Sequence, residues 1–313
     1  MTLTAYNHVP VPSFMYGTAW KKEATSQLVQ LAVAAGFTAI DTANQLIHYQ
    51  EALVGEALQA LGKKGIKRDA LFLQTKFTSV DGQGGQTPYD ASADLATQAR
   101  QSFDSSLTHL GTEYVDSYVL HAPISRRGLG AADWEVWAAM EGLYQSGKTK
   151  LIGVSNVAAG QLTQLCEQAN HKPMVVQNRC FAALGWDQEV REICQTNGII
   201  YQGFSLLTAN REVLADREIQ AIAKRLGTGP AQIIFRFAMQ IGMLPLTGTT
   251  SQQHMKEDLQ AEQLALSSEE IQRIETIALQ EENPAPVPSV IPRKRGHIPI
   301  NSDLSHFSPG HGL

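Results

Sequence analysis

The sequence predicts a single parallel (β/α)8 barrel, and three observations support this fold class. Short apolar segments alternate with segments of helical period along the 313 residues, as expected for a parallel sheet covered by helices. Several helical segments end in glycine, which readily adopts the left-handed conformation of a helix end. The first strand is followed by GTAWKK, which lacks the glycine fingerprint of the alternative fold, a doubly wound open sheet.

The expected elements follow in order along the chain. Helical segments at 26–36, 51–61, 96–111 and 133–147 are predicted to end at Gly36, Gly62, Gly111 and Gly147. The eight expected strands are residues 14–17, 37–41, 71–75, 115–120, 150–155, 174–178, 198–203 and 243–247.

Composition indicates one globular domain over residues 1–313. The chain is 43% hydrophobic and 18% charged, with a net charge of -5, so a large core can form. We see no basic block for nucleic acid, no apolar run of about 18 residues for a membrane span, and no secretion signal. We therefore expect a cytoplasmic protein with neither nucleic-acid nor membrane partners.

The cysteines and histidines do not indicate a metal site. Cys166, Cys180 and Cys194 show no CxxC spacing, so neither a disulfide framework nor a zinc site is expected. His109, His171 and His254 also lack the spacing of metal ligands. We expect no metal.

Two long loops and a tail depart from the strand–helix rhythm. Residues 78–90 and 121–133 each follow the C-terminal end of a predicted strand, where barrel enzymes build their active sites. Residues 283–313 are rich in proline and show little periodicity. We expect this segment to be a C-terminal tail or a substrate loop rather than a second domain.

Four ionisable residues come at or just after the ends of successive predicted strands. Asp41 ends the second strand, Tyr49 follows eight residues later, Lys76 directly follows the third strand and His121 directly follows the fourth. Taken singly, Asp41 could cap a helix, Lys76 could be a surface charge and Tyr49 a half-buried aromatic. Together they predict a cluster at one mouth of the barrel, where neighbouring groups shift one another's pKa values.

Six motifs in order resemble the aldo-keto reductase family. They are GTAW (17–20), DTA with LVGEAL (41–43 and 53–58), LQTKF (73–77), DSYVLHAP (116–123), EGLYQSGKTKLIGVSN (141–156) and the spacing from Pro173 to Gln177. The resemblance extends from about residue 9 to about residue 280, and it implies a monomer more often than not. It implies reduction of an aldehyde or ketone to an alcohol with a reduced nicotinamide nucleotide, which is preferably NADPH, although NADH is possible.

The resemblance assigns Asp41, Tyr49, Lys76 and His121 as the catalytic residues, and physical chemistry agrees. Carbonyl reduction needs a hydride at carbon and a proton at oxygen, and the protein must supply the proton. A free phenol has a pKa near about 10. We expect Lys76 to lower the pKa of Tyr49, Asp41 to keep Lys76 charged, and His121 to donate a hydrogen bond to the substrate oxygen.

The spacing between the aspartate and the tyrosine departs from the family pattern DTAxxY. Position 46 is a leucine, and strict register from the following helix points to His48 as the proton donor. The need for a phenol as proton donor points instead to Tyr49. We adopt Tyr49 and expect the loop NQLIH (44–48) to bulge so that the ring reaches the site. Trp20, His48 and Phe77 are expected to contact the substrate, joined by His297 and Phe307 of the tail.

The resemblance also assigns the cofactor site. Ser155, Asn156 and Gln177 would bind the nicotinamide carboxamide, and Phe204 would stack on its ring in place of the usual tyrosine. The lysine, serine and arginine that commonly bind the 2′-phosphate are replaced by Gly248, Thr249 and His254. The full expected set is Gly17, Thr18, Ser155, Asn156, Gln177, Phe204, Ser205, Leu207, Gly248, Thr249, Thr250, His254, Glu257 and Asp258.

A second hypothesis remains open from the sequence. Some barrels of this resemblance bind the nucleotide tightly and act as regulatory subunits rather than as catalysts. All four catalytic residue types are present here, which favours an enzyme with a small carbonyl substrate, but the shifted tyrosine keeps the regulatory alternative open.

Overall fold

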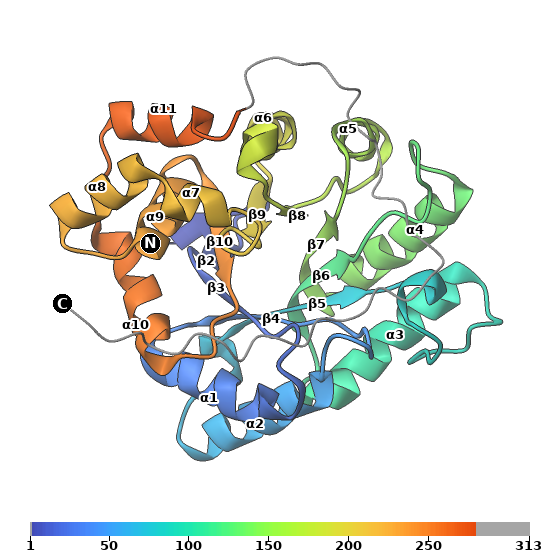
Figure 1. Ribbon diagram of the computed structural model, residues 1–313. Coiled ribbons are helices and arrows are strands. Elements are labelled where there is room, and N and C mark those ends of the chain that lie inside the picture. The colour runs from blue at the N-terminus through green and yellow to red at the C-terminus, as the bar shows by residue number, and fades with distance from the viewer. Residues whose placement is uncertain (1, 280–313) are drawn as a thin grey trace. The chain divides into compact units, whose positions relative to one another are not determined.

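A computed structural model describes residues 2–279 and contains the predicted barrel. Eight parallel strands close on themselves in the order β10-β3-β4-β5-β6-β7-β8-β9, and the helices lie outside them (Figure 1). Residues 2–279 belong to one compact unit by their contacts. The expected tail, with His297 and Phe307, lies outside the described residues.

The barrel strands lie close to the predicted segments. Each is three to seven residues long, and β6 and β10 match the expected bounds. The eight strands are β3 (Met15–Gly17), β4 (Ala39–Asp41), β5 (Phe72–Phe77), β6 (Val115–Leu120), β7 (Thr149–Ser155), β8 (Val175–Arg179), β9 (Ile200–Phe204) and β10 (Met243–Thr247).

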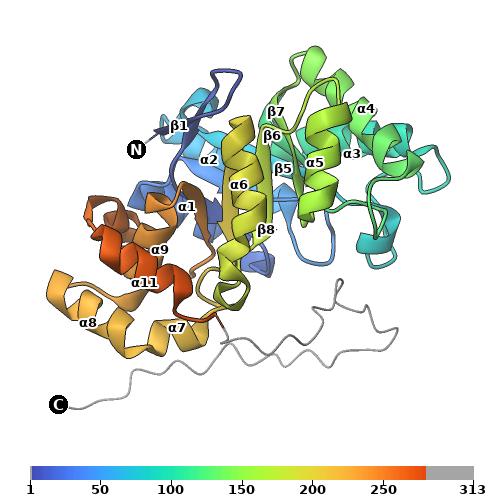
Figure 2. The ribbon, with the colours of Figure 1, turned by 90° about the horizontal axis from the view of Figure 1, so that it is seen from above.

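Helices cover the outer face of the barrel, and sequential neighbours such as α5 and α6 pack side by side (Figure 2). The long helices are amphipathic and bury one face against the strands. Their bounds are α1 (Thr25–Ala35), α2 (Glu51–Lys63), α3 (Leu95–Leu110), α4 (Ala131–Gln145), α5 (Ala159–Gln168), α6 (Gln188–Asn197), α7 (Arg211–Ala215), α8 (Arg217–Leu226), α9 (Pro230–Gln240), α10 (Gln252–Gln260) and α11 (Ser268–Thr276).

The hydrophobic core lies mainly between the strands and the helices. Side chains alternate along a strand, so every second residue faces the helices and the others face the barrel interior. Leu73, Val119 and Ile152 belong to the buried core. In contrast, the interior positions at the C-terminal half of several strands carry polar or charged side chains, including Gln74, Lys76 and Gln177, all buried. The polar site therefore lies inside the barrel.

Two local features differ from the sequence predictions. A hairpin of β1 (Thr2–Thr4) and β2 (Pro10–Pro12) precedes the barrel and was not expected. The prediction that Gly62 ends its helix is wrong, since α2 continues through Lys63. Gly36, Gly111 and Gly147 have φ angles of 122°, 62° and 76° at the ends of their helices, where a residue with a Cβ would be strained.

Candidate active site

A buried ion pair joins β4 to β5. The ammonium of Lys76 lies 2.6 Å from Oδ1 and 2.7 Å from Oδ2 of Asp41, and it also donates to the carbonyl of Thr42 at 2.8 Å. Lys76 is 0% and Asp41 3% exposed. Burial lowers the pKa of Lys76, while the charges of Asp41 and Glu51 oppose that shift. Asp41 therefore holds the ammonium in a fixed place and favours its charged form.

The Tyr49 ring lies between this lysine and His121. Its centre is 5.3 Å from the ammonium of Lys76 and 6.0 Å from the centre of the His121 ring, with the two rings in an edge-to-face arrangement. Tyr49 belongs to the loop between β4 and α2, and its backbone N–H donates to the carbonyl of Gln45. The loop thus brings together the four residues that the sequence analysis placed at strand ends.

The expectation that Lys76 lowers the pKa of Tyr49 is wrong for this structure. Burial, followed by the negative charge of Asp41, raises the pKa of Tyr49 well above the ordinary value of a phenol. Because Asp41 is bonded directly to Lys76, the pair acts on the phenol as a dipole rather than as a single positive charge. The Tyr49 hydroxyl is therefore held in its protonated, donor form.

His121 is held as a neutral imidazole. Its pKa is lowered to about 3 by burial first, and then by the charge of Lys76 and by His48. Nδ1 lies 2.6 Å from the hydroxyl of Thr78, and the carbonyl of His121 accepts a hydrogen bond from Asn156. When the Thr78 hydroxyl donates to Nδ1, the hydrogen of the neutral ring is on Nε2, which is then a donor.

His48, the alternative proton donor, is engaged elsewhere. Its ring centre lies 3.9 Å from that of Trp20, and its Nδ1 lies 2.7 Å from Oε1 of Gln45. Trp20 is 57% exposed, so this pair forms an open aromatic surface that a substrate can contact.

Phe77 does not fit the prediction that it contacts the substrate. It is fully buried and packs on Tyr89 with 5.7 Å between ring centres. Side chains alternate along β5, and Lys76 faces the barrel interior, so Phe77 faces the surrounding layer.

The predicted carboxamide-binding residues lie together at the ends of β7 and β8. Ser155 donates to the carbonyl of Gln177 at 2.5 Å and accepts from Asn156 at 3.1 Å. Asn156 is exposed and has a φ of 53°. Both N–H groups of Gln177 are used inside the barrel, by Asp41 at 3.1 Å and by Gln202 at 2.9 Å. Its side-chain carbonyl is the group left to accept from a ligand.

Five further predicted cofactor residues lie at or just after the ends of β3 and β9. Thr18 is buried and donates through its hydroxyl to the carbonyl of Asp41 at 2.9 Å, next to the partly buried Gly17. Phe204, Ser205 and Leu207 are partly buried. The guanidinium of Arg179, at the end of β8, lies 5.4 Å from the centre of the Phe204 ring.

The predicted phosphate-binding segment joins β10 to α10. Gly248 and Thr250 are exposed and Thr249 is partly buried, while Ser251 caps the helix by accepting from the N–H of His254 at 3.3 Å. His254 is exposed and Glu257 partly buried. Free N–H groups and hydroxyls at a helix N-terminus suit an anion.

Asp258 does not fit its predicted place among the cofactor-binding residues. It is buried and accepts a hydrogen bond from the hydroxyl of Thr247 at 2.8 Å. Burial raises its pKa to about 6, against the opposing effect of that hydrogen bond. Its carboxyl is directed at the end of β10, so we assign it a structural role.

The sequence analysis missed several residues that contact this site. Gln74 and Gln202 bond to one another and to the groups around Asp41. Thr78 contacts His121, and the ammonium of Lys21 donates to the carbonyl of Gly248. The alternation along LFLQTKF does place Gln74 on the same face as Lys76, which was a usable signal; nothing in the sequence pairs Lys21 with Gly248.

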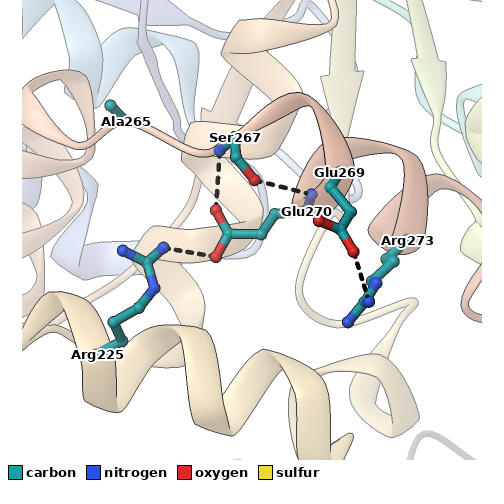
Figure 3. Close-up of a pocket in the computed structure, with 6 residues that line it drawn as sticks. All are labelled: Arg225, Ala265, Ser267, Glu269, Glu270 and Arg273. Atoms are coloured by element: carbon teal, nitrogen blue, oxygen red, sulfur yellow. Dashed lines mark hydrogen bonds and ion pairs between the residues drawn. The ribbon is translucent and has the colours of Figure 1, made fainter.

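Two surface cavities lie apart from these residues. One, of about 440 Å³, is lined by ion-paired side chains of α8 and α11: Arg225 contacts Glu270 at 2.5 Å and Arg273 contacts Glu269 at 2.7 Å (Figure 3). The other, of about 540 Å³, includes Asn7 and His171. Within residues 2–279 no group of three His, Cys, Asp or Glu side chains is placed to hold a metal ion. No helix in that range has both the length and the apolar character needed to cross a membrane.

Comparison with known proteins identifies the family. The profile of the aldo/keto reductase family matches residues 13–279. An uncharacterised oxidoreductase of Bacillus subtilis (strain 168), YtbE, is 30% identical over 278 residues, which cover 88% of this chain and 91% of that protein. The NADPH-dependent alpha-keto amide reductase of Saccharomyces cerevisiae (strain ATCC 204508 / S288c) is 29% identical over 302 residues, covering 90% of this chain and 91% of that protein.

A solved structure agrees. The crystal structure of an aldo/keto reductase from Brucella melitensis superposes with a TM-score of 0.75 at 27% sequence identity, covering 89% of this chain and 99% of that one. The protein is therefore a (β/α)8 barrel that belongs to the aldo/keto reductase family, a family of oxidoreductases.

Proposed function

We propose that this protein is an NADPH-dependent carbonyl reductase in which Tyr49 donates the proton. The observation that carries the proposal is the position of the Tyr49 ring, 5.3 Å from the Lys76 ammonium and 6.0 Å from the His121 ring. A phenol, a fixed ammonium and a neutral imidazole in one place are the groups needed to bind and protonate a carbonyl oxygen.

Each residue has a distinct role in this proposal. Tyr49 transfers its hydroxyl proton to the substrate oxygen as the carbonyl carbon accepts a hydride. The ammonium of Lys76 stabilises the phenolate that results, and Asp41 holds that ammonium in place. His121, which is neutral because its pKa is lowered to about 3, donates a hydrogen bond to the same oxygen through Nε2.

The residues present fit a nicotinamide nucleotide. The N–H groups of the Gln177 side chain bond to Asp41 and Gln202, so its side-chain carbonyl can accept from a carboxamide N–H. Asn156 and Ser155 add amide and hydroxyl groups next to it, and Phe204 offers an aromatic face. The bound nucleotide would supply the hydride.

Preference for NADPH rests on the segment from β10 to α10. Exposed N–H groups and hydroxyls at the start of α10 favour a phosphate, and His254 can add a positive charge when protonated. No carboxylate stands at Gly248 or Thr249 to repel a 2′-phosphate. The name of the yeast relative, an NADPH-dependent reductase, agrees with this choice.

We further propose that the substrates are small or aromatic carbonyl compounds. Trp20 and His48 present an exposed aromatic surface near the catalytic loop. A relative from Bacillus subtilis (strain 168), 29% identical over 279 residues that cover 88% of this chain and 92% of that protein, is named a glyoxal reductase.

A direct assay tests this function. The purified protein would be mixed with NADPH and either glyoxal or a nitrobenzaldehyde, while the absorbance of the reduced nicotinamide is followed. We expect turnover that depends on both the aldehyde and the protein. Tight binding of NADPH with no oxidation by any carbonyl would contradict the proposal and support the regulatory alternative.

A further inference from the structure

Two glutamines meet across the axis of the barrel. Gln74 comes from β5 and Gln202 from β9, which are four strands apart in the closed order and hence opposite one another. Nε2 of Gln74 donates to Oε1 of Gln202 at 2.8 Å, and Nε2 of Gln202 donates back at 3.0 Å. Both side chains are 0% exposed. This reciprocal amide pair spans the interior of the barrel.

The amide pair is bonded to the Asp41 carboxylate. Oδ1 of Asp41 accepts from Nε2 of Gln74 at 2.8 Å, from Gln177 at 3.1 Å and from Lys76 at 2.6 Å. Oε1 of Gln202 accepts from both Gln74 and Gln177. Asp41 on β4 and Gln177 on β8 are themselves on opposite strands, so two pairs of opposed strands hold one carboxylate.

The directions of these hydrogen bonds are fixed by chemistry. A carboxylate can only accept, so Gln74 and Gln177 must each turn an N–H toward Asp41. If the side-chain amide of Gln177 were flipped, its oxygen would face two other acceptors, Oδ1 of Asp41 and Oε1 of Gln202. Buried amides are also costly compared with the branched apolar residues that usually fill a barrel interior. Their arrangement around one charged group therefore indicates a task beyond filling space.

We propose that Gln74 and Gln202 are positioning residues that orient the Asp41 carboxylate and, through it, the Lys76 ammonium beside Tyr49. Without the Gln74 donor, Asp41 can rotate and the ammonium loses its fixed place. The amide N–H groups of Gln74 and Gln177 also donate to Asp41 whether or not Lys76 is protonated. The kinetic part of this proposal rests on the proposed function; the effect on Lys76 does not.

The sign of the effect on Lys76 follows from its surroundings. The groups that face it are Asp41, Glu51, Tyr49 and neutral His121. When Lys76 loses its proton, Asp41 remains charged and must be stabilised by the amide donors alone. Removing the Gln74 donor therefore destabilises Asp41 beside neutral Lys76 more than it destabilises Asp41 beside charged Lys76. Lys76 should then keep its proton to a higher pH.

Gln74→Met tests the proposal, because methionine keeps the length of the side chain and removes its N–H groups. The titration of Lys76 would be followed in the full-length protein through lysine ε-carbons labelled with 13C, with the signal assigned by its loss in Lys76→Met. We expect the midpoint to rise by about one pH unit, the size expected for a hydrogen bond to a charged group. In the assay above, kcat should fall about tenfold, with NADPH affinity unchanged.

Two controls separate positioning from packing. Gln98→Met removes an equally buried glutamine of α3 that bonds only to the carbonyls of Ala91 and Ala93; it should lower thermal stability and leave the Lys76 midpoint unchanged. The double variant Gln74→Met/Gln202→Met removes both amides of the pair, so neither one remains buried after losing the other. It should regain stability without regaining the wild-type midpoint or kcat.

The outcomes are distinct. If Gln74→Met lowers stability as Gln98→Met does and leaves the Lys76 midpoint in place, the amides serve packing only and the proposal is wrong. If the wild type reduces no carbonyl but the midpoint rises in Gln74→Met, the proposed function fails and the positioning of Lys76 stands. A midpoint that falls would also overturn the inference.

Discussion

The ammonium of Lys76 lies 5.3 Å from the centre of the Tyr49 ring, although the two residues come from different kinds of structure. Lys76 is fixed on β5, whereas Tyr49 lies in a loop eight residues beyond Asp41. The loop carries the ring over the ion pair of Lys76 and Asp41. The eight-residue spacing from Asp41 to Tyr49 therefore still allows the ring to contact the ammonium that Asp41 binds.

Replacing the proposed proton donor should abolish reduction. Tyr49→Phe keeps the ring contacts with Lys76 and His121 and removes only the hydroxyl, so kcat should fall about 10²–10⁴-fold. NADPH binding, measured by fluorescence titration, should be nearly unchanged. His48→Ala is the comparison variant, because His48 is the alternative donor and its ring packs on Trp20. Loss of turnover in His48→Ala with normal turnover in Tyr49→Phe would show that the donor has been misassigned.

The pH profile of reduction should have an alkaline limb set by Lys76. Burial raises the pKa of Tyr49, so the donor stays protonated, and burial lowers the pKa of Lys76. The rate should therefore be full below the Lys76 pKa and decrease as pH rises through it. His121, with a pKa lowered to about 3, is neutral throughout and should add no acid limb above about pH 5.

Single-turnover rates of the wild type and of Lys76→Met measure this limb. The variant should be slower at every pH, because the charge that stabilises the phenolate is gone, and its residual rate should lack the alkaline limb. An unchanged limb in Lys76→Met would assign it to another group.

Cofactor preference should depend on pH. The segment from Gly248 to Ser251 offers N–H groups and hydroxyls at the start of α10, and His254 is the ionisable group nearest to it in sequence. His254 adds a positive charge to this segment only when it is protonated. We expect kcat/KM to favour NADPH over NADH clearly at about pH 6 and less at about pH 8, and His254→Gln to remove that dependence. A clear preference for NADH at both pH values would contradict the assignment.

Asp258 should make stability decrease with pH. Its pKa is raised from 3.8 to about 6 in the folded state, so the folded protein binds this proton more tightly than the unfolded chain does. The stabilisation is full below about pH 4 and is lost as pH rises through about 6, by up to about 3 kcal/mol. Asp258→Asn keeps an oxygen for the Thr247 hydroxyl and does not ionise.

Denaturant unfolding across this range measures the effect. The free energy of unfolding of Asp258→Asn should gain on that of the wild type as pH rises from about 4 to about 7. Glu257→Gln, next to it on α10 and more exposed, should show no such gain. A constant difference between Asp258→Asn and the wild type would mean that Asp258 titrates normally in the folded state.

Much of the fold could be predicted because it depends on local patterns. The bounds of β6 and β10 follow from short apolar runs, and the expected barrel closes in the expected order. The β1–β2 hairpin was not predicted, because its three-residue strands contain little periodicity and, unlike the short barrel strands, are not separated by a helical segment. The end of α2 was misplaced since a glycine near a helix end is compatible with the helix continuing for a residue.

The sequence by itself determined the residue types of the site and their order along the strands, because a parallel barrel carries every strand end to one face. The tertiary structure decided how those side chains share their partners. Gln74 and Gln202 are 128 residues apart and meet only because β5 and β9 lie on opposite sides of a closed barrel. The raised pKa of Tyr49 was likewise decided there: burial and the bonding of Lys76 to Asp41 outweigh the effect of a lone ammonium.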